Sequence, residues 1–313
     1  MVCILSINTN LLLIACLDFF GLILKRWQII WQDSLLSITY DRATSTTSID
    51  QHHQPNESEG SAKASYTDCM RSLCRIGLEI VRNRANPRGH NHELLRTVEL
   101  HEQIKAIIER AADHLKDPKS CRSIKEHLEY WNLYMHKSYI TADLCRRIFH
   151  RGKHNVDLLA SLEKTCIESL MDTVEAFLGL QKITQFANQS WAAVHRSLSS
   201  ALLLGVLGEP RRNERARILL QGLMFVMSDL SSGLDPLEVS GPIWRSLAAL
   251  QKLIPWDQNT EGQTDAGTSE GDTESTTRLL VSSTPSSLFT MEDGSPYTLV
   301  DNILWGKSRT QPD

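Results

Sequence analysis

An apolar stripe within residues 155–183 constrains the fold more strongly than any other feature of this sequence. Its members recur mostly at three- and four-residue spacing: Leu158, Leu162, Cys166, Ile167, Leu170, Val174, Phe177 and Leu178. That spacing gathers the side chains on one wide face of an α-helix, and such a face must be buried against other elements. The stripe therefore predicts a long amphipathic helix.

Similar periodicity is found along much of the chain, in residues 66–84, 91–115, 191–207, 213–230 and 242–254. Asn91 and Ser190 are placed to cap two of these helices. Asp117 and Pro118 predict another helix start, and Thr141 is expected to cap a further short helix. No run alternates like a strand between hairpin turns, so the chain is predicted to be all-α, with an irregular multi-helix domain.

Composition divides the chain into four predicted segments. They are apolar N-terminal helices at 1–42, a flexible loop rich in Ser and Thr at 43–64, a helical domain at 65–256 and an acidic tail at 257–313. Residues 257–302 carry nine acidic side chains against one basic side chain, Arg278. Such a segment cannot bury enough apolar surface to fold, so the tail is predicted to be disordered.

An apolar patch at 296–305 lies near the end of that tail. If these residues form a helix, one face gathers the protein-interaction candidates Tyr297, Val300, Leu304 and Trp305. The patch would then bind a groove on another protein. The alternative is that it docks back onto the helical domain of its own chain.

Residues 11–24 are apolar apart from Asp18. Fourteen residues are short for a membrane span, an aspartate is costly in lipid, and the basic residues follow the run instead of preceding it. We therefore expect a buried helix and no membrane span. A membrane-associated segment, and a signal or anchor, are the alternatives.

The sequence lacks the usual patterns of catalytic and metal sites. The His–Glu pairs at 92–93 and 101–102 do not complete a zinc-protease motif. Ser190, His195 and Ser199 lie on or beside one predicted helix, but no acid is placed to orient the histidine. No nucleophile elbow or glycine-rich phosphate loop occurs. We therefore predict a non-enzymatic chain with no catalytic residue, no cofactor and no metal.

Charge and cysteine content narrow the functional class. The net charge of -4 gives no general reason to bind nucleic acid. The basic runs at 145–154 and 209–217 are interpreted as solvated helix ends, because mixed charge usually marks exposed helix faces. Seven cysteines without a C-x-x-C pair favour a reducing, intracellular compartment.

The stretch at 26–42 raises the question of function most directly. Trp27, Trp31 and Leu35 share one helical face, which suits a core or an interface, while Asp33 and Ser34 are consistent with a new helix or turn. WQDSLLSITYDR, residues 31–42, resembles the tryptophan–acid–serine–leucine–leucine and tyrosine–aspartate–arginine motif of the middle homology region of fungal-specific transcription factors. Further stretches resemble later parts of that region, in the same order: 69–82, 190–209, 213–223 and 295–306.

The resemblance implies a helical regulatory domain of the zinc-cluster regulators and a nuclear location, with the cytoplasm as the alternative. It implies transcriptional regulation through protein contacts with the transcription machinery or another regulator, a dimer partner included. Secondary-metabolite or nutrient-utilisation genes are typical targets of the family.

The closely spaced cysteines of the family's DNA-binding module are absent. We therefore expect no specific DNA binding by this chain alone, and a truncated homologue, a gene fragment or a regulator that acts through a partner. The alternative function is an all-α membrane-associated protein or enzyme with an N-terminal anchor.

Overall fold

The computed structural model describes residues 22–40, 45, 63–85, 90–145, 156–184, 186–232, 241–254 and 296–305. Within these ranges the chain is all-α and forms no strand; Ala64 and Ala111 make an isolated bridge. The predicted fold class is therefore confirmed. The N-terminal run at 11–21 and the acidic stretch at 257–295 lie outside the described residues, so the predictions made for them stay predictions.

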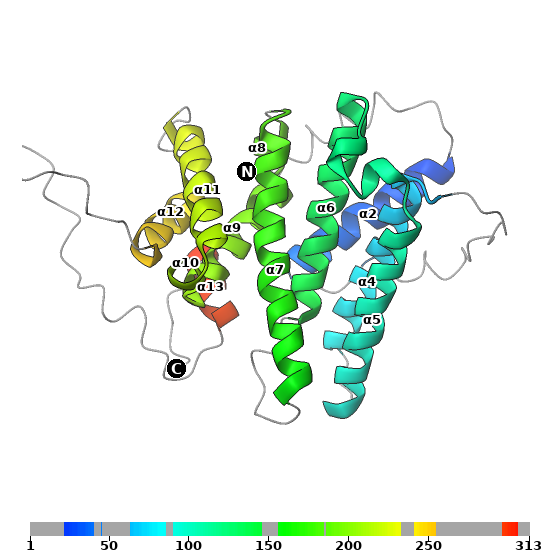
Figure 1. Cartoon of the computed structure of the whole chain (residues 1–313), viewed down its shortest axis with the longest axis horizontal. Helices are drawn as coiled ribbons and strands as arrows, with labels where there is room; N and C mark the ends of the chain where they lie inside the picture. The colour runs from blue at the N-terminus through cyan, green and yellow to red at the C-terminus, as the bar shows by residue number, and fades with distance from the viewer. Residues whose placement is uncertain are drawn as a thin grey trace, which may run out of the picture.

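The first half of the chain contributes α2 (Leu22–Tyr40), α4 (Tyr66–Ala85), α5 (His90–Arg110), the short 3-10 helices η1 (Asp113–Leu115) and η2 (Pro118–Ser120), and α6 (Ile124–Cys145). The second half contributes α7 (Val156–Gln181), α8 (Phe186–Gln189), α9 (Trp191–Val206), α10 (Glu209–Arg212), α11 (Glu214–Ser232), α12 (Gly241–Leu253) and α13 (Pro296–Trp305). Figure 1 shows α6 and α7 side by side at the centre, with α4 and α5 on one side and α9 to α13 on the other.

The core consists of two hydrophobic clusters that share α6. The α4–α5 cluster includes Ile38, Leu73, Ile76, Ile80, Leu100, Ile104, Leu133 and Ile140. The α7–α9 cluster includes Met135, Leu162, Leu170, Val174, Phe177, Leu198, Leu202, Leu220, Leu247, Val300 and Leu304. The apolar stripe predicted for 155–183 supplies much of the second cluster. Helix α6 supplies both because its apolar residues point in two directions.

Helix α6 corrects two predicted boundaries. Thr141 does not cap a new helix: it is buried inside α6, where its hydroxyl donates to the Lys137 carbonyl at 2.9 Å. The start predicted at Asp117 and Pro118 belongs to η2, where the Asp117 carboxylate accepts a bond from the backbone N–H of Lys119 at 3.0 Å. A threonine hydroxyl can bond within the helix as well as cap one, so residue type alone did not separate these cases.

Helix α2 runs unbroken through Asp33 and Ser34, so no helix or turn begins there. Both side chains are buried, and both bond outside their own helix. The Asp33 carboxylate accepts from the backbone N–H of Ser45 at 2.8 Å, and the Ser34 hydroxyl donates to the Cys74 carbonyl of α4 at 3.4 Å. Because α2 also contacts α9, it joins the two sides of the core.

Among the described residues, no helix combines the length and the apolar character that crossing a membrane requires.

Candidate functional site

The C-terminal patch lies against the helical domain of its own chain. Val300 and Leu304 of α13 are buried in the α7–α9 cluster, and α13 packs on α9 and α12. Of the two alternatives for this patch, the docked one therefore describes these two side chains. The side chains of Tyr297 and Trp305, the other two interaction candidates, lie outside the described residues.

Arg245 of α12 holds the end of α13. Its Nε donates to the Ile303 carbonyl at 2.9 Å, and its Nη2 donates to the Leu304 carbonyl at 2.8 Å. The last carbonyls of a helix have no partner within the helix and carry partial negative charge, so a guanidinium suits this place. The α12–α13 contact is thus polar as well as apolar.

A second candidate region is a group of buried polar side chains on α9, α6 and α4. Arg196 of α9 is 3% exposed, and its Nη1 donates to Nδ1 of His136 on α6 at 3.1 Å. Nε2 of the same imidazole lies 3.5 Å from the Cys74 sulfur on α4. The Arg196 guanidinium also stacks over the Tyr139 ring, 4.8 Å from its centroid. Sequence reasoning missed this group, although Arg196 is the only Lys, Arg, Asp or Glu between Trp191 and Val206.

The two histidines of this region are held neutral. Burial, and to a lesser extent the neighbouring Arg196, hold the pKa of His136 well below its ordinary value. The same two causes lower the pKa of His195 to about 4. Removing an imidazole from water penalises its charged form, and a nearby guanidinium adds repulsion. Neither ring is therefore a cation at neutral pH.

The serine and histidine residues noted on the 190–199 segment do not form a nucleophile pair. His195 is buried beside Trp191, with the ring centroids 6.0 Å apart. Ser199 donates to the Arg196 carbonyl at 3.1 Å, and Ser190 precedes α9 as its N-cap residue without a side-chain capping bond. These contacts are those of helix packing, as the sequence predicted.

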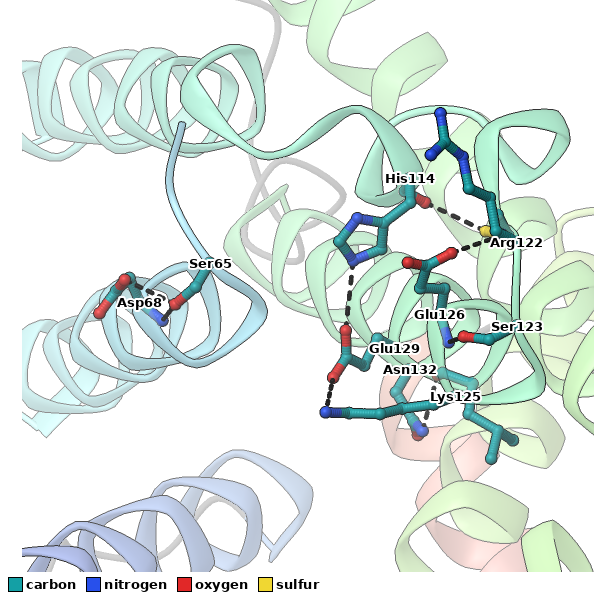
Figure 2. A network of polar contacts seen from close by, with 11 residues as sticks. Ser65, Asp68, His114, Arg122, Ser123, Lys125, Glu126, Glu129 and Asn132 are labelled. Atoms are coloured by element: carbon teal, nitrogen blue, oxygen red, sulfur yellow. Dashed lines mark hydrogen bonds and ion pairs between the residues drawn. The ribbon is translucent and has the colours of Figure 1, made fainter. Parts of the chain in front are cut away.

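Figure 2 shows a polar network where the chain enters α6. The Ser123 hydroxyl accepts from the backbone N–H of Glu126 at 3.2 Å, and the Glu126 carboxylate accepts from the backbone N–H of Arg122. Nε2 of His114 lies 3.2 Å from Glu129, whose other oxygen lies 3.7 Å from Lys125. This network closes the start of a helix in the manner of a capping box.

The described residues contain no group of three or more His, Cys, Asp or Glu side chains placed to hold a metal ion. Arg215, in the basic run at 209–217, pairs with Asp172 at 2.8 Å and with Glu175, both on α7. Arg212 and Arg217 lie 3.5 Å from Glu209 and 3.6 Å from Glu214. These pairs fit the interpretation as a mixed-charge helix end. The other basic run, apart from Cys145, lies outside the described residues.

Comparisons with protein-family models, with curated proteins and with solved structures found no match for this chain.

Proposed function

We propose that this chain is a transcriptional regulator of the fungal-specific transcription factor type, built from the family's helical regulatory domain and acting through protein contacts. The proposal rests first on the five stretches that resemble the family in its own order. It also rests on how these stretches pack.

The packing of these stretches is the observation that carries the proposal. Helix α2, which contains most of 31–42, packs on α4, which contains 69–82. Helix α9, from the stretch 190–209, contacts α2, α11 and α13. Stretches that are far apart in the sequence thus share one interior around α9. Five isolated similarities would not be expected to do so, and this supports their origin in one type of domain.

A partner is proposed as the source of DNA contact. The cysteine framework of the family's DNA-binding module is absent from the sequence, and the net charge of -4 does not favour phosphate. The chain alone should therefore bind DNA weakly, with an affinity that falls steeply as salt is raised. A fluorescence anisotropy titration that finds nanomolar, sequence-selective binding at physiological salt would contradict this part.

The test of the regulatory function is a tethered reporter assay. The full chain is fused to a heterologous DNA-binding domain, and transcript from a reporter with the matching operators is measured in a fungal host. We expect transcript to differ from that with the DNA-binding domain alone. A matched fusion carrying Leu202→Asp, which places a charge in the fully buried face of α9, should lose the effect.

An unchanged transcript level from a wild-type fusion that is nuclear, soluble and bound to its operators would overturn the proposal.

A further inference from the structure

Arg196 presents an unsolved charge in the interior. A guanidinium keeps its proton under any condition in which the protein folds, and a buried charge is costly without a counter-charge. No carboxylate among the described residues forms an ion pair with Arg196, and its Nε and Nη2 atoms are buried without a hydrogen-bond partner there. The structure must therefore supply negative charge in some other form.

The contacts of Arg196 determine the hydrogen-bond directions in this region. Arginine has only donors, so Nδ1 of His136 must accept the bond from Nη1. The proton of this neutral imidazole then sits on Nε2 and points to the Cys74 sulfur, 3.5 Å away. The sulfur is thus an acceptor in a chain that begins at a permanent positive charge.

Three groups that can become anions act electrostatically on Arg196: Tyr139, Cys74 and Asp143. Asp143 already forms a buried ion pair with Arg84 of α4. Tyr139 offers the face of its ring, which attracts the guanidinium without ionisation. A thiol ionises more readily than a phenol, so Cys74 is the remaining source of charge.

We propose that Cys74 is a thiolate in the folded chain, that the Nε2–H of His136 stabilises it, and that it is the counter-charge of Arg196. The pair links α4, α6 and α9 between the two hydrophobic clusters. Protonation or chemical capping of one sulfur atom then leaves the guanidinium uncompensated, which makes the interior sensitive to modification of Cys74. The other titratable groups on the helices packed around this pair include Asp33, Tyr66, Tyr139, Asp143 and His195.

The first test is spectroscopic and uses the full chain. Thiolates absorb in the ultraviolet where thiols do not, so the difference spectrum between the wild type and Cys74→Ser at neutral pH should contain a thiolate band. The band should be absent when the same difference is taken in an Arg196→Met background. Cys145→Ser is the matched control, because burial and Asp143 raise the pKa of Cys145 to about 12 and keep it a thiol.

The second test is a double-mutant cycle measured by thermal unfolding. Cys74→Ala should lower Tm by about 4 °C or more beyond its effect in the Arg196→Met background, where no charge needs compensation. Cys145→Ala should lower Tm equally in both backgrounds. The advantage of the wild type over Cys74→Ser should also grow as pH rises, until an unfolded cysteine ionises near about pH 8.5, because below that pH the unfolded chain holds a proton that the folded chain has released.

A missing thiolate band at neutral pH, or equal Tm losses for Cys74→Ala in both backgrounds, would overturn the proposal. Stabilisation of the wild type by chloride or phosphate that disappears in Arg196→Met would also overturn it, because the counter-charge would then be an external anion.

Discussion

Gly179 of α7 lies against the indole ring of Trp131 on α6. A Cβ atom added to Gly179 would meet the ring atoms Cδ2 and Cε2 at 2.5 Å and Cε3 at 2.8 Å. Glycine inside a helix is less favourable than alanine by roughly 0.5–1 kcal/mol, so the position needs a reason. The reason is this close approach of the two central helices, which a larger residue would prevent.

Gly179→Ala should therefore destabilise the fold although alanine favours helices. We expect the free energy of unfolding to fall by about 1–3 kcal/mol, because the rigid indole must move within a packed core. Urea denaturation measures this. The control is Gly222→Ala on α11, where the added atom meets only Leu178 Cδ1, at 3.3 Å. That variant should be neutral or more stable, by at most about 1 kcal/mol. Equal losses in the two variants would contradict the explanation.

Helical periodicity was sufficient to predict the fold class and the course of α7, α9, α11 and α12. It predicted less well where polar residues serve packing. Asp33 and Ser34 resemble a helix start, yet they lie inside α2 because each bonds to a backbone group from another segment. The short helices α8 and α10 carry too few apolar residues for a periodic signal. Such outcomes depend on tertiary contacts that local sequence does not encode.

The buried candidates illustrate the same limit. The apolar face of 296–305 predicted a helix with Val300 and Leu304 on one side, and that much is visible from spacing alone. The choice between a partner and the chain's own core depended on α9 and α12, which are distant in sequence. Arg196, His136 and Cys74 come from three helices, so no motif joins them before the chain folds.

Leu304→Ala should destabilise the whole domain. Leu304 is fully buried in the α7–α9 cluster, so truncation leaves a cavity and removes apolar contact. The expected loss is about 2–5 kcal/mol in the free energy of unfolding. Chemical denaturation followed by tryptophan fluorescence measures it. Asn302→Ala, an exposed change on the same helix, should stay within about 0.5 kcal/mol of the wild type. A Leu304→Ala protein as stable as Asn302→Ala would show that α13 contributes little to the core.

The buried pair of Arg84 and Asp143 should show strong coupling. It joins α4 to α6, and the two side chains are 11% and 7% exposed. Arg84→Met should cost about 3–5 kcal/mol, because it leaves a buried carboxylate without its counter-charge. The double variant Arg84→Met with Asp143→Leu should recover much of that loss. Additive losses in a double-mutant cycle would be inconsistent with a buried ion pair at this position.

Acid should weaken the fold through His195. Its pKa of about 4 in the folded chain lies below its ordinary value of 6.5, so below pH 6.5 the unfolded chain binds a proton that the folded chain refuses. Stability is therefore full above pH 6.5 and is lost as pH falls toward 4, by at most about 3 kcal/mol for this group. His195→Gln should reduce the slope of unfolding free energy against pH in that window. An unchanged slope would show that His195 does not contribute.

Hydrogen–deuterium exchange of α13 tests most directly whether the family-like segments form one folded regulatory body. If α13 belongs to that interior, the amides of 299–304 in the full chain should be protected to nearly the same free energy as those at the centre of α9, and Leu304→Ala should remove the protection. Exchange of α13 at the rate of an unstructured peptide, while α9 stays protected, would contradict a shared core and return the patch to the role of a free partner-binding segment.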